Sequence, residues 1–129
     1  MKSAEDLDVF KLAHGLTLRV YQETRHFPKE EMFGLVSQMR RAASSVGMNL
    51  MEGSMRLNRR EYRQFVGMAR GSASEVSYQL FLAKDLGYLS AELYGELRSA
   101  FNRVGRMLTR LSQALGGELR ARETSTRQT

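Results

Sequence analysis

The chain has 129 residues with no cysteine, no tryptophan and a single proline, and its 20 basic and 14 acidic side chains give a formal net charge of +6. This length suits one domain with one core, and the lack of cysteine excludes a disulfide framework and a thiolate metal site. No apolar run approaches the roughly 20 residues that cross a bilayer, and the first residues are more acidic than a secretory leader, so we expect a cytoplasmic protein without a membrane partner.

Apolar residues recur at helical spacing in four segments, and the Asn-Gly and Asp-Gly pairs typical of β-hairpin turns are missing. The first predicted helix runs over about residues 5–25 and ends ahead of Pro28, because the residue before a proline disfavours helical geometry. Pro28 suits the first turn of the second predicted helix. The apolar stripe of this helix covers residues 35–50, and its end is expected near Gly53.

The third predicted helix starts at Asn58, a good N-cap residue, and continues to Leu86, with Gly87 as its C-terminal cap. Ser90 opens the fourth helix. Its apolar stripe consists of Leu93, Leu97, Ala100, Val104, Met107 and Leu111, and Gly116-Gly117 is its expected end.

Four helices of roughly 20 to 28 residues, joined by short turns, predict an all-α fold of the antiparallel up-and-down four-helix bundle type. The bundle domain covers residues 1–117. Residues 118–129 contain one apolar side chain of any size, Leu119, and are expected to form a flexible C-terminal tail.

Motifs for catalysis or metal binding are poorly represented. The two histidines, His14 and His26, lie twelve residues apart, and the single Glu-x-x-His spacing, from Glu23 to His26, has no second copy of the kind that di-iron bundles use. There is also no Gly-x-Ser-x-Gly and no glycine-rich phosphate loop. We therefore expect a protein that is not an enzyme, with no catalytic residue, no metal and no cofactor.

The positive charge belongs to the second half of the chain, where residues 56–129 supply the whole excess, mostly as arginine. Arginine binds phosphate through two hydrogen bonds, so clustered arginines favour a polyanionic partner. Two groups are candidates for nucleic-acid binding: a stripe on the fourth helix, Arg103, Arg106 and Arg110, and a cluster at the start of the third, Arg56, Arg59, Arg60 and Arg63. The alternative interpretation of the stripe is an ordinary solvated face.

Small and aromatic residues mark the third helix and the turn that follows it. Two glycines within five residues, Gly67 and Gly71, are unfavourable inside a helix and suggest close approach of a neighbouring helix or subunit. The aromatic residues Tyr78, Phe81, Tyr88 and Tyr94 exceed what one core stripe requires, so some are candidates for burial between subunits.

The stretches Ser37-Gln38-Met39-Arg40-Arg41-Ala42-Ala43-Ser44-Ser45 and Asn49-Leu50-Met51-Glu52-Gly53 resemble the bacterial four-helix-bundle proteins encoded in 23S ribosomal RNA intervening sequences. The similarity covers nearly all of residues 7–115. One departure is Val46-Gly47, where the family usually has Ile-Pro. The resemblance implies a left-handed bundle that assembles as a ring, typically a homopentamer with a central channel. It also implies association with RNA and similarity to accessory variability proteins that assist the reverse transcriptases of retroelements.

The polar residues of the family motif are of types that form a satisfied hydrogen-bond network inside a bundle, and we interpret them as structural rather than as RNA contacts: Arg41, Asn49, Glu52, Ser72 and Glu75. The predicted function is therefore a non-enzymatic homo-oligomer that binds structured RNA, or an RNA–protein complex, through arginine–phosphate contacts. The alternative is a protein-interaction scaffold or accessory subunit for a polymerase or reverse transcriptase.

Overall fold

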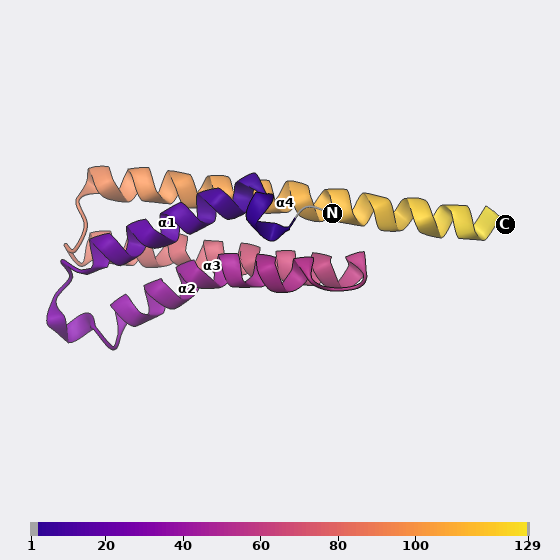
Figure 1. The fold of residues 1–129 in the computed structure, drawn as a ribbon. Coiled ribbons are helices and arrows are strands. Elements are labelled where there is room, and N and C mark those ends of the chain that lie inside the picture. The colour runs from indigo at the N-terminus through magenta and orange to yellow at the C-terminus, as the bar shows by residue number, and fades with distance from the viewer. Residues whose placement is uncertain (1–2, 129) are drawn as a thin grey trace.

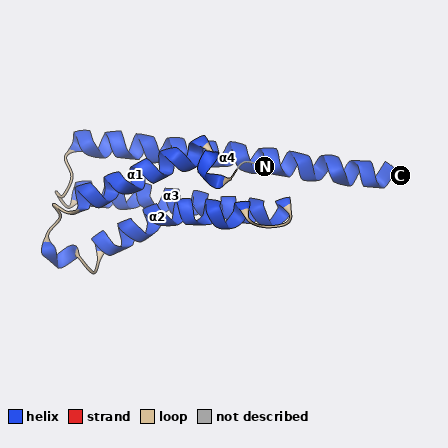
Figure 2. Ribbon diagram, in the orientation of Figure 1, coloured by secondary structure: helices blue, strands red, loops and turns tan. Residues whose placement is uncertain are grey.

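The computed structural model describes the backbone of residues 3–128 and the side chains of residues 3–117. Its four α-helices are α1 (Asp8–Thr24), α2 (Leu35–Ser54), α3 (Arg59–Asp85) and α4 (Ala91–Gln128). Two single-turn 3-10 helices, η1 (Ala4–Asp6) and η2 (Lys29–Glu31), precede α1 and α2, and no strand occurs among residues 3–128 (Figure 2). The predicted all-α fold with four helices is confirmed.

The four helices pack side by side as a bundle. Each helix packs against its neighbour in the chain, and α4 also packs on α1, while the most extensive contacts are those that α3 makes with α2 and α4. The chain reverses direction at each connection between consecutive helices, and α4 projects well beyond the ends of the other three (Figure 1). No helix among the described residues is long and apolar enough to cross a membrane.

A single core runs along the bundle axis and receives apolar side chains from all four helices. On α4 the fully buried positions are Leu97, Phe101, Val104 and Leu108, whereas Met107 and Leu111 are only partly buried. The buried arc is therefore rotated by about half a residue, roughly 50° around the helix axis, from the predicted stripe. The reason is that α4 packs more extensively on α3 than on α1, so the side chains that face α3 are covered best.

Both ends of α3 match the expected caps. At its start the Asn58 side chain accepts a hydrogen bond from the Glu61 amide at 2.8 Å. At its end Gly87 has a φ of +83°, which glycine tolerates without strain. The Tyr88 amide donates to the Ala83 carbonyl at 2.9 Å, and the Gly87 amide donates to the Lys84 carbonyl at 2.9 Å. These two hydrogen bonds form a Schellman motif.

The starts of the first two helices differ from the sequence prediction. Leu7 is extended, with ψ of 134°, so the first segment divides into η1 and α1 instead of one helix. Pro28 does not open the second helix, because the chain first forms η2 and then passes through Gly34, with φ of −110° and ψ of −110°, before α2 begins at Leu35. Proline presets one turn, but that turn need not continue as the same helix.

The end of the fourth helix was also predicted wrongly. The backbone of α4 stays helical through Gly116-Gly117 to Gln128. Gly116 is buried beneath the guanidinium of Arg63, and a Cβ at this position would lie 2.9 Å from the Arg63 Cζ. The glycine therefore makes room for a contact between helices and does not end α4. The side chains of residues 118–129 lie outside the described residues, so the division into a bundle of residues 1–117 and a tail of 118–129 stays a prediction.

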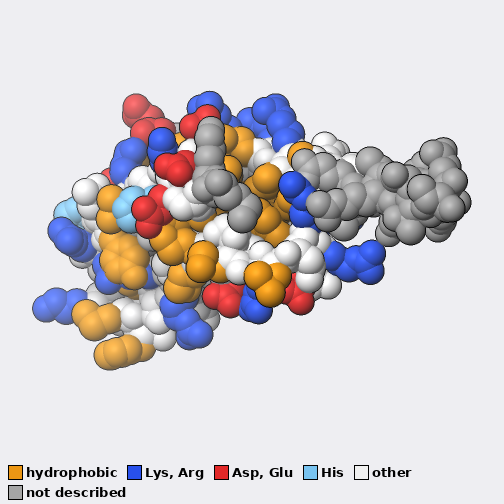
Figure 3. Space-filling model, turned by 45° about the vertical axis from the view of Figure 1, so that its right-hand side comes forward, with side chains coloured by type: hydrophobic (Ala, Val, Ile, Leu, Met, Phe, Trp, Pro, Cys, Tyr) orange, Lys and Arg blue, Asp and Glu red, His pale blue; other side chains and the backbone are white. Residues whose placement is uncertain are grey.

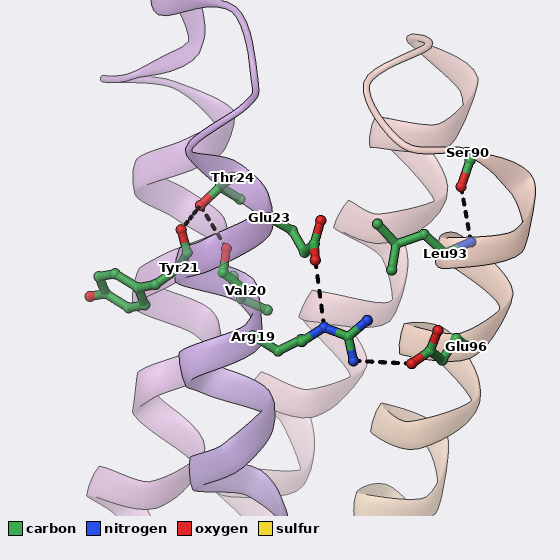
Figure 4. A network of polar contacts seen from close by, with 8 residues as sticks. All are labelled: Arg19, Val20, Tyr21, Glu23, Thr24, Ser90, Leu93 and Glu96. Atoms are coloured by element: carbon green, nitrogen blue, oxygen red, sulfur yellow. Dashed lines mark hydrogen bonds and ion pairs between the residues drawn. The ribbon is translucent and has the colours of Figure 1, made fainter.

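Polar contacts connect α1 to α4 (Figure 4) and α1 to α2. Arg19 lies between two carboxylates: its Nη1 is 3.0 Å from Glu96 Oε1 on α4, and its Nε is 3.5 Å from Glu23 Oε1 on its own helix. The hydrogen bond with Glu96 raises the pKa of Arg19 above its usual value. On the side of α2, Arg40 Nε donates to the hydroxyl of Thr24 at 3.0 Å.

Candidate nucleic-acid interface

An open groove of ≈ 570 Å³ runs between α3 and α4. Small residues on both helices leave this space, because the glycines among them have no side chain that could fill it. A Cβ added at Gly67, Gly71 or Gly105 would meet no atom within 4 Å. Among the residues that the structure describes, the close approach that the sequence suggested for Gly67 and Gly71 is therefore not made. The residues that line the groove are Gly67, Arg70, Gly71, Ala73, Ser74, Ser77, Phe101, Asn102, Gly105, Arg106 and Thr109.

The groove is basic and rich in hydrogen-bonding groups. Arg70 and Arg106 enter its lining from opposite helices, and none of the 11 lining residues is acidic. Arg70 Nη1 donates to Thr109 Oγ1 at 3.2 Å, which directs the guanidinium across toward α4. At the end of the groove away from Arg70, the hydroxyl of Ser77 donates to Asn102 Oδ1 at 3.0 Å. Such a surface suits an anion with several acceptor oxygens.

Arg63 extends the basic surface toward the end of the bundle from which α4 projects. Its Nε donates to Ser112 Oγ at 3.2 Å. Arg63 and Arg70 are seven residues apart, two helical turns, so they lie on the same edge of α3 and both reach toward α4. Sequence analysis did not single out Arg70. The spacing of seven from Arg63 was the signal that could have identified it.

The stripe on α4 is turned to solvent. Arg103, Arg106 and Arg110 are all exposed, and none of them forms an ion pair with a carboxylate in the part of the chain that the structure describes. Only Arg106 lines the groove. Figure 3 shows basic side chains distributed over this face of the molecule, including the end from which α4 projects.

The cluster at the start of α3 does not act as one unit. Arg59 and Arg60 are exposed on the first turn. Arg56 precedes the helix, and its Nη2 lies 2.6 Å from Glu52 Oε1 while its guanidinium sits 4.7 Å from the centre of the Phe65 ring. Because its guanidinium already pairs with a carboxylate, Arg56 is a weaker candidate for contact with a phosphate than Arg63.

The polar residues of the family motif divide between two environments. Ser72 on α3 accepts a hydrogen bond from Ser45 on α2 at 2.6 Å, which joins the two helices, whereas Asn49 donates to the Ser45 carbonyl at 2.8 Å within α2. Arg41 and Glu75 instead are exposed and line a second groove, between α2 and α3. Among the described residues, Ser72 thus makes a contact between helices, Asn49 and Glu52 each make a contact with a residue four positions away, and Arg41 and Glu75 are exposed. The predicted polar network stays a prediction.

The α2–α3 groove has a volume of ≈ 670 Å³ and holds one buried polar atom without a partner. Gln79 is 7% exposed, and its Oε1 accepts no hydrogen bond from the described part of the chain. Met48 and Tyr78, which are largely exposed, also line this groove. A buried acceptor without a donor is unfavourable, which favours cover by a further molecule that donates a hydrogen bond.

Other chemistry finds little support in the described residues. No group of three or more His, Asp or Glu side chains that could hold a metal occurs among them. The Tyr88 hydroxyl donates to Glu31 Oε2 at 2.9 Å, and this hydrogen bond raises the pKa of Tyr88 above 10.0. The contact joins the α3–α4 turn to η2 and lies outside both grooves.

Comparison with known proteins places the chain in a family. The family model described as 23S rRNA-intervening sequence protein matches residues 5–110. The fold is similar to the crystal structure of a protein of unknown function from the S23 ribosomal protein family of Bacteroides thetaiotaomicron, with a TM-score of 0.75, 20% sequence identity, and coverage of 81% of this chain and 95% of that chain. No curated protein matches the chain. The all-helical fold and the match over residues 5–110 together show that the chain belongs to the family of 23S rRNA-intervening sequence proteins.

Proposed function

We propose that this chain is a cytoplasmic, non-enzymatic, homo-oligomeric bundle that binds structured RNA through arginine–phosphate contacts, with the α3–α4 groove as the contact surface. The observation that carries the proposal is the composition of the groove, which receives Arg70 and Arg106 from two helices and has no acidic lining residue. Arg63, Arg103 and Arg110 extend the positive surface around it. The phosphate backbone supplies most of the affinity in such complexes, so several such contacts favour binding without sequence readout.

A solvated face explains this arrangement less well. Surface charges that serve solubility alone are usually interspersed with charges of the opposite sign. Here no acid occurs between residues 97 and 117, and Glu92 and Glu96, both near the start of α4, lie outside the groove lining. Like charges on facing helices repel one another, and a bound polyanion relieves that repulsion.

The proposed assembly is a left-handed bundle in a ring, with a pentamer expected from the family resemblance. The α2–α3 groove supports self-association, since a second copy can donate to Gln79 Oε1 and cover Met48. In a ring the basic grooves repeat around an axis, which strengthens weak contacts through avidity. We expect sedimentation to give about five times the mass of one chain. The Glu75→Lys substitution, in the same groove, should shift the chain toward monomer.

The RNA proposal is tested by fluorescence anisotropy with a structured RNA hairpin, duplex DNA and heparin across a salt series. Wild-type protein should prefer the hairpin and lose affinity steeply as salt rises. Reversal of the stripe, with Arg103→Glu, Arg106→Glu and Arg110→Glu, should weaken binding and reduce the salt slope by roughly 2 to 3, because each lost contact contributes about 0.7 to 0.9. No binding at low salt would refute the proposal.

A matched control separates the groove from overall charge. Lys11, Arg25 and Lys29 are exposed cations on α1 and on the connection to α2. Reversal of these three to glutamate changes the net charge by the same amount as reversal of the stripe. We expect this control variant to retain most of the affinity. If both triple variants lose binding equally, the attraction is general and the groove has no special role.

The second candidate function is a scaffold for a protein partner such as a polymerase or reverse transcriptase. It is favoured by the exposed apolar side chains at the connection between α1 and α2, where Phe33 is 93% exposed and Met32 is also open to solvent. Figure 3 shows hydrophobic side chains protruding at this end of the molecule. A complex with the polymerase that survives nuclease treatment and is lost with Phe33→Ser would favour the scaffold.

A further inference from the structure

Four side chains form a compact group at the far end of the α3–α4 pair. Lys84 Nζ lies 4.9 Å from the centre of the Phe81 ring and 4.7 Å from that of Tyr94, and Arg98 Cζ lies 5.6 Å from both rings. The two rings meet edge to face at 6.2 Å. The group therefore combines two cations with two aromatic rings contributed by different helices.

This group carries excess positive charge. The carboxylate paired with it among the described residues is Asp85, whose Oδ1 is 3.5 Å from Lys84 Nζ, and both side chains are partly exposed. Arg98 donates to the Tyr94 hydroxyl and forms no ion pair with a described carboxylate. Cation–π contacts hold the two positive groups near each other. The site can therefore accept another anion.

The group continues the basic groove. Phe81 follows the groove residue Ser77 by four positions on α3, and Arg98 precedes the groove residue Asn102 by four positions on α4. Four residues advance a helix by about 6 Å, slightly more than one turn. An extended ligand that follows the phosphate contacts at Arg106 therefore reaches this group without leaving the α3–α4 surface.

Exposed aromatic rings lie within this group of four side chains and next to it. Tyr78 is 62% exposed and Phe81 is 39% exposed. They are three residues apart on α3, which makes them neighbours on the helix surface. The Tyr78 ring makes no aromatic, cation–π or hydrogen-bond contact with the described part of the chain. An aromatic face that is open to water next to a cationic track is the arrangement that binds single-stranded nucleic acid, because every base offers a flat surface for stacking.

We propose that Tyr78, Phe81, Lys84 and Arg98 form a subsite for unpaired nucleotides, in which the rings stack on bases and the two cations contact the adjoining phosphates. The inference rests on the proposed RNA binding and specifies its ligand as RNA that contains a single-stranded segment. Bases in a continuous duplex are stacked on one another and cannot reach the rings, so a duplex uses only the arginine groove. Single strands should therefore bind more tightly than duplexes of the same length.

The experiment compares a labelled oligouridine with an RNA duplex of the same length by fluorescence anisotropy. The double variant Tyr78→Leu/Phe81→Leu keeps the apolar bulk and all charges but removes the aromatic faces. It should weaken oligouridine binding by between about 5- and 150-fold for each base that stacks, and leave duplex binding within about twofold. Tyr21→Leu is the matched control, since Tyr21 is an exposed ring on α1 with Arg40 at 4.7 Å from its centre. This control should change neither affinity.

The possible outcomes separate the two proposals. If the wild-type protein binds both RNAs and the double variant weakens both equally or neither, the nucleotide subsite is wrong while the basic groove stands. If the wild-type protein binds neither RNA at low salt, RNA binding itself is wrong and the subsite falls with it. Circular dichroism and thermal unfolding verify that the variants fold, and the single variant Tyr78→Leu replaces the double variant if that one is unstable.

Discussion

Arg70 offers the sharpest test of the basic groove, because sequence analysis did not identify it and the structure places it in the lining. The Arg70→Gln substitution removes one charge, and both residues favour helix. Its hydrogen bond with Thr109 is exposed, so the free energy of unfolding should fall by less than about 1 kcal/mol. One lost phosphate contact should reduce the slope of log affinity against log salt by about 0.7 to 0.9. A rise in salt from about 50 to 200 mM should therefore weaken RNA binding by the variant about threefold less than it weakens binding by the wild type.

The assay is anisotropy with the same RNA hairpin at several salt concentrations, and Arg25→Gln is the control. Arg25 is exposed at the end of α1 and lies outside the groove lining, so its replacement changes the net charge equally. Its salt slope should stay that of the wild type. Equal slopes for the two variants would refute the assignment of Arg70, since they would show that only the net charge of the protein matters.

Three further predictions concern the stability of the bundle, and urea unfolding monitored by circular dichroism measures each. Gly53→Ala places a Cβ 2.7 Å from the Cβ of Phe65 and should lower the free energy of unfolding by about 1 to 3 kcal/mol, whereas Gly67→Ala meets open space and should raise it by up to about 1 kcal/mol; a gain at both sites would contradict the contact. Ser72→Ala removes the hydrogen bond from Ser45 and should lower it by about 1 kcal/mol, and no loss would show that this bond is not needed. Burial raises the pKa of Tyr62 above 10.0, so its neutral form contributes stability that is present below pH 10 and is lost as the pH rises through the raised value; Tyr62→Phe should remove this part of the alkaline decline, and an unchanged decline would assign it to other groups.

Much of the local structure follows from the sequence alone. Asn58, Gly87 and Ser90 mark the ends of helices because caps depend on hydrogen bonds between residues a few positions apart. The helical spacing of apolar residues predicts four packed helices for a similar reason, since periodicity defines one face of each. The family could be recognised as well, and the match over residues 5–110 confirms it.

The candidate site depends on the tertiary structure. Arg63 and Arg70 belong to α3 and Arg106 to α4, and only the packing of these helices places them along one groove. The separation in sequence between Arg106 and the two α3 arginines carries no signal of their proximity, and Arg56 shows the converse, since it neighbours the cluster in sequence but pairs with Glu52.

The same limit explains the errors at the helix ends and in the α4 stripe. Gly116-Gly117 has the local character of a helix end, yet α4 continues because Gly116 accommodates the Arg63 side chain from α3. The buried arc of α4 centres on Phe101 and Leu108, since α3 covers that side more fully than α1 covers the other. Sequence by itself determined which segments are helical and which residues carry charge, because those properties are local. Which charged edges and aromatic rings share a surface was decided only when the helices packed, because packing free energy depends on partners that are distant in the chain.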